Sequence, residues 1–252
     1  MSVFALSDLH LSFGIPSKSM EVFGEKWFNY QERIRDNWCR AVSQEDLVLI
    51  AGDISWAMDL EHALVDLEWI HALPGTKLIL RGNHDYWWPS FSKLKQFLPP
   101  SIHFIQNNAF SWGDISFAGS RLWDTQEYSF GSISAYSIDE KTLASKMKDE
   151  DECRADEKIF QRELQRLEIS LQALDQKARL RVALTHYPPI GLDLKSSRAA
   201  ELLEKYRVDI CIFGHLHGLR GDVGPLFGKR GSVCYVLTSS DYLQFFPIKI
   251  IT

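Results

Sequence analysis

The sequence has few cysteines, and they form no Cys-x-x-Cys motif. Four cysteines occur among 252 residues. Two of them, Cys211 and Cys234, lie in apolar runs, where they are predicted to be small core residues. This usage argues against a framework of disulfides and favours a reducing compartment.

Long apolar segments are also missing. The apolar run at residues 2–6 is too short for the core of a signal peptide. No other run is long enough to span a membrane. We therefore expect a soluble, cytoplasmic protein without a membrane span.

Positive charge is scattered along the chain. Lys and Arg number 28 against 33 Asp and Glu, which gives a formal net charge of −5. No block of basic residues forms the footprint that nucleic-acid binding requires. Nucleic acid is therefore not the expected partner, and a nuclease gains no support, although charge alone does not exclude it.

Apolar residues are plentiful, at 45% of the chain, which is enough for one substantial core. Short apolar runs, many rich in β-branched residues, are predicted to be strands. They span residues 2–6, 46–51, 77–80, 102–106, 115–118, 180–185, 208–213, 233–238 and 245–251. Helical periodicity lies between some of these runs, which predicts an α/β layered fold in a single domain, residues 1–252.

Three stretches repeat apolar residues at helical spacing. Two cover residues 27–41 and 60–70, and the third, residues 160–174, is predicted to pack as an amphipathic helix on the core. Residues 124–157 are rich first in Ser, Gly and aromatic residues and then in charge. We predict that this stretch forms a charged insertion or small cap near a site. The alternative is an ordinary surface loop.

Polar clusters follow five of the apolar runs, each at the point where the run ends. The clusters are Ser7-Asp8-Leu9-His10, Gly52-Asp53, Arg81-Gly82-Asn83-His84-Asp85, Thr185-His186 and Gly214-His215-Leu216-His217. Ligands of α/β sheets bind at the carboxyl ends of strands, so we expect the clusters to converge on one edge of the sheet. Five of the eight histidines belong to them, whereas His62, His71 and His103 are expected to be structural.

The clusters combine imidazole, carboxylate and amide groups without a thiolate. This combination suits borderline-to-hard divalent ions, and seven such ligands fit two ions that share a carboxylate. A two-metal site clamps the attacking and leaving oxygens of a displacement at phosphorus. Each motif alone can be explained by chance or packing, but five of them at strand ends favour a functional site.

In their order along the chain, the five motifs resemble those of the calcineurin-like metallophosphoesterase superfamily. The match extends from residue 8 to residue 217 and departs at Thr185-His186, where the family more often has Gly-His. The resemblance implies a four-layer α/β (α+β) sandwich, in which helices flank two mixed β-sheets. It also implies that metal ions bind at the carboxyl ends of the strands.

The resemblance further implies a role for each residue. Seven residues would bind two divalent ions: Asp8, His10 and His217 the first, Asn83, His186 and His215 the second, and Asp53 both. Manganese is the first expectation, and iron, zinc, nickel or cobalt suit the same ligands. A hydroxide held by the ions would attack phosphorus in line. His84 would serve the leaving-group oxygen as general acid or stabilise charge on the phosphoryl group.

The implied reaction is metal-dependent hydrolysis of a phosphoester, with phosphomonoesters and phosphodiesters both open as substrates. A small phosphorylated molecule is the expected partner, and the oligomeric state stays open. A non-catalytic scaffold on the same fold is disfavoured, because neither a ligand nor His84 is missing. Protein phosphatases of the superfamily orient the catalytic histidine with an Asp soon after the bridging Asp. Here that stretch reads Ile54-Ser55-Trp56-Ala57, so the group that orients His84 is left open.

Residues beside the motifs have supporting roles. Asp85 is expected to anchor the loop or a metal ligand, and Gly82 to let the backbone turn between strand and site. The aromatic residues 86–88 are expected to pack beneath the loop. Arg121 and Trp123 follow the run at residues 115–118. Either they face the site, with Arg121 on a phosphate oxygen, or they form a surface arginine beside a core tryptophan.

Overall fold

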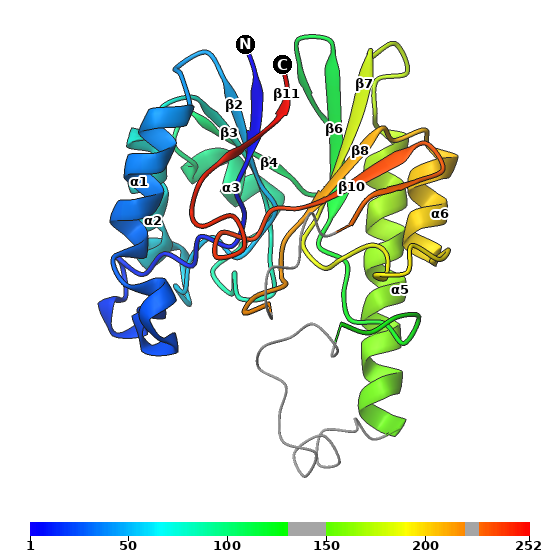
Figure 1. Ribbon diagram of the computed structural model, residues 1–252, viewed down its shortest axis with the longest axis horizontal. Helices are drawn as coiled ribbons and strands as arrows, with labels where there is room; N and C mark the ends of the chain where they lie inside the picture. Colours follow the sequence, from blue (N-terminus) through cyan, green and yellow to red (C-terminus); the bar gives the residue numbers. More distant parts are fainter. Residues whose placement is uncertain (131–149, 220–226) are drawn as a thin grey trace.

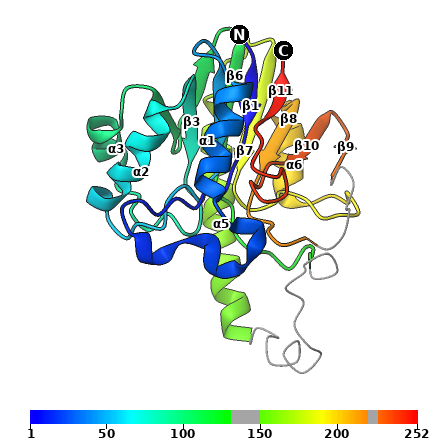
Figure 2. The same ribbon diagram turned by 60° about the vertical axis from the view of Figure 1, so that its left-hand side comes forward.

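The computed structural model describes residues 1–130, 150–219 and 227–252. Its strands form two sheets that stack face to face, and helices cover the outer face of each sheet (Figures 1 and 2). This four-layer sandwich is the fold that the sequence predicts. Among the residues described, none of the helices has the length and hydropathy of a membrane span.

The first sheet has the strand order β11-β1-β2-β3-β4. Its strands are β11 (Ile248–Ile251), β1 (Val3–Ala5), β2 (Leu47–Ile50), β3 (Thr76–Leu80) and β4 (Ile102–Ile105). The strands β1 to β4 are parallel, and β11 pairs antiparallel with β1 at the edge. The carboxyl ends of β1, β2 and β3 therefore lie side by side.

The second sheet has the order β5-β6-β7-β8-β10-β9. Its strands are β5 (Phe110–Trp112), β6 (Ile115–Ser120), β7 (Leu180–Thr185), β8 (Ile210–Phe213), β10 (Val233–Leu237) and β9 (Lys229–Arg230). The four central strands are parallel, and both edge strands are antiparallel. Every predicted strand is present. The strands β5 and β9 were not predicted, because they are too short to show a recognisable pattern of apolar residues.

The apolar character of the strands follows from their burial on both faces. On β1, Val3 and Ala5 face the second sheet, while Phe4 packs with the helices of the first. On β7, Leu184 joins the layer between the sheets and Ala183 the helical layer. The middle layer is therefore a dry core that fixes the two sheets, and their strand ends, relative to each other.

Helices cover the outer faces as their periodicity requires. The first sheet carries α1 (Tyr30–Ala41), α2 (Leu60–Ala72) and α3 (Phe91–Phe97), and the second carries α5 (Glu150–Gln172) and α6 (Arg198–Lys205). The apolar stripe of α5 is buried against the second sheet, which confirms the predicted amphipathic helix. Trp27 lies in a preceding 3-10 helix rather than in α1, because Asn29 adopts a left-handed conformation between them.

The stretch predicted as an insertion or cap is described only in part. Residues 124–130 leave β6 as a loop, and residues 150–157 are the first turns of α5. Residues 131–149 lie outside the described part of the chain. The first turns of α5 extend past the carboxyl ends of the strands (Figure 1).

Two expectations about burial are wrong. Cys234 is exposed, because alternate side chains of β10 point away from the core, whereas Cys211 on β8 is buried as predicted. Of the three aromatic residues after the Asn83 motif, Trp87 and Trp88 pack beneath the loop, but Tyr86 is 55% exposed.

Candidate metal centre

The five strand-end clusters meet at one place. Asp8 and His10 follow β1, Asp53 follows β2 and Asn83 follows β3, all in the first sheet. The second sheet contributes His186 after β7, and His215 and His217 after β8. The predicted convergence is therefore found, although it lies between the ends of two sheets and not on the edge of one.

Asp8, His10 and His217 form one group whose ligand atoms all lie within 4.8 Å of one another. The Nε2 atoms of His10 and His217 are 3.1 Å apart, and His217 Nε2 is 3.6 Å from Asp8 Oδ1. These are the three residues that the sequence assigns to one metal ion.

A second group surrounds His186. Its Nε2 atom lies 2.6 Å from Asn83 Oδ1 and 3.4 Å from Asp53 Oδ2. His215 Nδ1 is 3.1 Å from the same Asn83 oxygen. Asp8, Asp53 and His186 also satisfy the 4.8 Å criterion for a metal-binding group. The residues assigned to the second ion thus lie together.

Asp53 lies between the two groups. Its Oδ2 atom is 3.4 Å from His186 Nε2 in one group and 3.7 Å from His10 Nε2 in the other. The side chain is 1% exposed, so its charge is shielded from water. This placement is the one that a bridging carboxylate requires.

Hydrogen bonds fix the tautomers of two histidines in a way that fits metal ions. His186 Nδ1 donates to the carbonyl of Ala51 at 2.9 Å, and His217 Nδ1 donates to Asp241 at 2.8 Å. In the neutral rings both Nε2 atoms then carry lone pairs, which face other ligand atoms of the centre. His10 Nδ1 is also buried without a partner among the described residues. Cations between these lone pairs satisfy this arrangement.

Burial and the neighbouring charges shift the pKa values of the centre in opposite directions. Burial raises the pKa of Asp53, but His186 and His10 lower it well below its ordinary value. For His186, burial lowers the pKa, and Asp53 and Asp8 raise it to about 9. For His10, burial dominates and lowers the pKa to about 4. Ionised carboxylates and a neutral imidazole are the forms in which these residues bind metals.

Backbone strain is concentrated at the same place. Asp8, His10, Asp53 and His215 have φ angles of 58°, 46°, 51° and 71°. Residues with a Cβ seldom occupy this left-handed region, and strained residues of this kind cluster at functional sites. The surrounding sheets hold these four residues in conformations that direct their side chains into the centre.

Close approach of side chains explains two glycines. A Cβ on Gly82 would lie 2.1 Å from Asp53 Oδ1, and a Cβ on Gly214 would lie 2.2 Å from Asp8 Oδ2. Gly82 is not among the glycines with a positive φ, so a left-handed turn is not the reason for glycine here. Both glycines instead leave room for a carboxylate from a neighbouring strand end.

Asp85 anchors the loop, as predicted. Its Oδ1 atom accepts hydrogen bonds from the backbone of Ile54 and Ser55 and from the Trp87 indole. Its Oδ2 atom accepts from the backbone of Gly82 at 2.7 Å. The loops after β2 and β3 are therefore tied together at the base of the centre.

His84 lies at the rim of the centre and belongs to neither group. Its backbone N–H donates to Asp53 Oδ1 at 2.9 Å, and its half-buried ring lies 5.7 Å from the His10 ring. The ring packs against Trp56 at 4.4 Å between centroids. Asp59, the first carboxylate after Asp53, caps α2 by accepting from the His62 N–H. Among the described residues, packing on Trp56 therefore takes the place of the carboxylate that orients the histidine in protein phosphatases.

Of the two residues after β6, only Trp123 turns toward the site. The Arg121 guanidinium lies 3.4 Å from Glu163 and 4.5 Å from the Trp123 ring. Trp123 lines a cavity that His215 also lines. Arg121 contributes through its backbone carbonyl, which accepts from the N–H of His186 at 3.2 Å.

Sequence reasoning missed Asp241, which holds His217. Asp241 Oδ1 accepts from His217 Nδ1, and its Oδ2 accepts from Gly218 N–H at 2.9 Å and from Lys26 Nζ at 3.1 Å. A signal was present, because the polar run Thr238–Asp241 follows the predicted strand at residues 233–238. It is a sixth polar cluster at a strand end.

Replacing Asp241 with alanine should weaken metal binding by about 10–100-fold, because His217 loses the group that fixes its ring and tautomer. Asp241→Asn, which keeps an acceptor oxygen, should lose less. Competition with a chromogenic chelator measures the affinity, and circular dichroism checks the fold. An alanine variant that is folded and binds metal as tightly as the wild type would contradict this role for Asp241.

Two mixed sheets flanked by helices, with Asp, His and Asn clusters at the strand ends, define a metallophosphoesterase fold. The chain belongs to the calcineurin-like phosphoesterase family, whose model matches residues 1–219. The activity of this family is the metal-dependent hydrolysis of phosphoester bonds. This confirms the predicted superfamily and reaction class.

Solved structures with low sequence identity are similar to this chain. The phosphopantetheinyl hydrolase of Mycobacterium tuberculosis has a TM-score of 0.50 and 12% identity, with 99% of this chain and 95% of that chain covered. A protein of unknown function from Aquifex aeolicus, AQ665, has a TM-score of 0.45 and 16% identity, with coverage of 98% and 95%. GAP50, the anchor in the inner membrane complex of Plasmodium, has a TM-score of 0.47 and 13% identity, with 96% of this chain and 72% of that chain covered. No match was found among curated proteins.

Proposed function

We propose that the chain hydrolyses a small organic phosphate at a two-metal centre built from the seven converging residues. The main support is the arrangement of His186 and His217. Each ring has its Nδ1 fixed by a hydrogen bond, and each Nε2 faces the other ligand atoms of its group. A ring held in this way presents its Nε2 atom to a metal ion, as ligating histidines do.

We assign the ligands to the two ions as the family resemblance implies. Asp8, His10 and His217 would hold one ion, Asn83, His186 and His215 the other, and Asp53 both. Divalent ions bound there supply Lewis-acid activation of water and of the phosphoryl oxygens. Manganese is our first choice, and iron, zinc, nickel or cobalt suit the same imidazole and carboxylate ligands.

His84 would protonate the leaving-group oxygen as the phosphorus–oxygen bond breaks. Its ring is half-buried at the rim, outside both ligand groups, where a bound phosphoester can reach it. Packing on Trp56 limits the orientations of the ring, and the bond from its backbone N–H to Asp53 ties it to the centre. This position supports a role for His84 as general acid.

The proposal is tested by hydrolysis of bis-p-nitrophenyl phosphate and p-nitrophenyl phosphate with protein stripped of metal and reloaded with manganese. We expect turnover that requires both manganese and His84. A preference for the diester would direct the search toward phosphodiesters, and a preference for the monoester toward phosphatase substrates. Absence of turnover of either ester, with two ions demonstrably bound, would contradict the proposal.

A further inference from the structure

We infer that the cavity beside the metal centre receives a positively charged organic group of the substrate. This inference rests on the proposed function, because it assigns the substrate class of the same site. The cavity has a volume of about 850 Å³. This size suits a small organic ligand.

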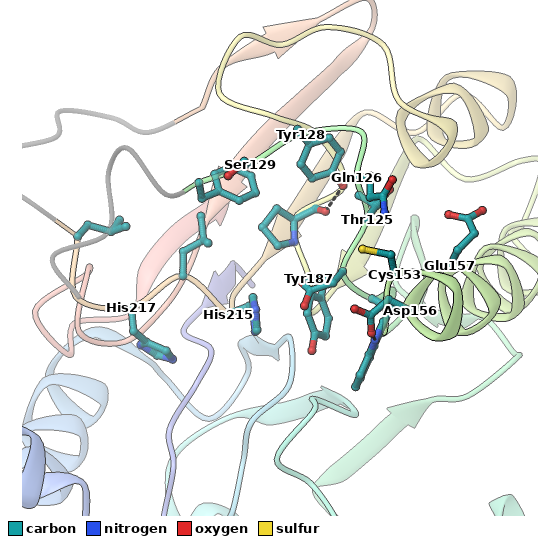
Figure 3. Close-up of a pocket in the computed structure, with 16 residues that line it drawn as sticks. Thr125, Gln126, Tyr128, Ser129, Cys153, Asp156, Glu157, Tyr187, His215 and His217 are labelled. Atoms are coloured by element: carbon teal, nitrogen blue, oxygen red, sulfur yellow. Dashed lines mark hydrogen bonds between the residues drawn. The ribbon is translucent and has the colours of Figure 1, made fainter. Parts of the chain in front are cut away.

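The cavity opens directly on the candidate metal ligands. His215 and His217 line one side of it, and Cys153, Asp156 and Glu157 from the first turns of α5 line the other (Figure 3). A phosphoester whose phosphate lies at the metal centre would therefore extend its organic part toward α5.

An aromatic wall connects the two sides. The Tyr187 ring lies 4.0 Å from the His215 ring and 5.0 Å from the Trp123 ring. Trp123 Nε1 donates a hydrogen bond to Asp156 Oδ1 at 2.8 Å. The wall thus runs from a candidate metal ligand to a carboxylate without a break, and Figure 3 shows Tyr187 between His215 and Asp156.

A second pair of rings lines the cavity from the loop after β6. Tyr128 and Phe130 lie 5.6 Å apart in an edge-to-face arrangement. The Tyr128 hydroxyl donates to the carbonyl of Pro188 at 2.6 Å, which fixes the ring in the wall. Tyr128 and Phe130 thus add aromatic surface to the lining, and aromatic rings attract cations.

The described residues of the lining include three carboxylates beside the two histidines. They include Asp124, Asp156 and Glu157, and neither a lysine nor an arginine. Arg198 pairs with Glu157 from outside the lining, at 2.6 and 3.0 Å. Burial, and then neighbouring carboxylates that include Asp124, raise the pKa of Tyr128. The carboxylates among the described lining residues favour a cationic group of the ligand.

Carboxylates beside aromatic faces form the environment that binds ammonium and quaternary ammonium groups. A substrate with one phosphate and a cationic organic part would satisfy both ends of the site. Its phosphate would bind at the metal centre, and its cation would lie between the rings and Asp156.

Two isosteric diesters test the inference in manganese-loaded enzyme. p-Nitrophenyl phosphorylcholine carries a trimethylammonium group, and p-nitrophenyl 3,3-dimethylbutyl phosphate carries a neutral tert-butyl group of the same shape. Both release p-nitrophenolate, so only the charge of the other ester group differs. We expect kcat/KM to be about 10-fold higher for the cationic ester, in line with a desolvated cation–π contact.

Substitutions on α5 test whether the preference for the cationic ester arises in this cavity. Asp156→Asn removes the charge and keeps an oxygen to accept from Trp123, so the ratio of the two kcat/KM values should fall toward one. Asp151→Asn makes the same change on the same helix at a residue that does not line the cavity, and it should retain the ratio. A preference that both variants keep would overturn the assignment to this cavity.

The outcomes separate the inference from the proposed function. Turnover of both esters with equal kcat/KM would overturn the inference and leave the phosphoesterase intact. If neither ester is hydrolysed, the proposed function has failed for diesters, and calorimetry then compares the binding of phosphorylcholine with that of 3,3-dimethylbutyl phosphate. Tighter binding of phosphorylcholine would support the inference, and equal or weaker binding would overturn it.

Discussion

Replacing Asp53 with asparagine should remove bound metal and activity together. Asp53 is buried between the two ligand groups, and its Oδ2 atom lies within 3.7 Å of both His10 and His186. Asparagine keeps the size of the side chain but offers one neutral oxygen to two cations. The loss of metal affinity should exceed about 100-fold, which is the upper end of the loss when a hydrogen-bond partner of a metal ligand is removed.

Metal content by plasma mass spectrometry and kcat/KM should therefore fall in parallel in Asp53→Asn. Asp66→Asn is the matched control, because Asp66 is a buried aspartate that accepts from Ser55 and the Phe13 N–H away from the ligand groups. That variant should keep its metal. Full occupancy of both metal sites in Asp53→Asn would rule out the bridging role.

Replacing His84 with alanine should leave both ions bound and lower kcat by about 10²–10⁴-fold, the usual contribution of a general acid. The ring belongs to neither ligand group, so metal affinity has no reason to change. The loss should be larger for phenyl than for p-nitrophenyl esters, because phenolate depends more on protonation as it leaves. Metal content and kcat for the two esters measure both effects.

His62→Ala provides the control for loss of a histidine. His62 is exposed on α2, where it interacts with Asp59 and belongs to neither ligand group. It should retain full turnover. If His84→Ala keeps the turnover of the wild type with both esters, His84 has no catalytic role and the proton comes from another source.

The strands and the polar residues that converge at their ends could be predicted because both signals are local. An apolar run buried on both faces, followed directly by polar residues, describes β2 and Asp53 as well as β8 and His215. The pairing of strands into two sheets is not local, so the sequence placed the clusters on one sheet edge. The structure gathers them from two.

The supporting residues were harder to predict, since their roles depend on partners distant in sequence. Asp241 meets His217 only because β10 pairs with β8, and Trp56 meets His84 because β2 and β3 are neighbours. Gly82 shows the same limit. Its sequence suggests a flexible turn, but the reason for glycine is the Asp53 carboxylate that lies against it.

Titration of metal-free protein with manganese, with bound metal and phosphodiester hydrolysis followed together, tests the two-metal centre most directly. We predict saturation at two ions per chain, with turnover that appears only as the second ion binds, because Asp53 joins two complete ligand groups. Full turnover with a single bound ion at saturation would contradict the centre described above.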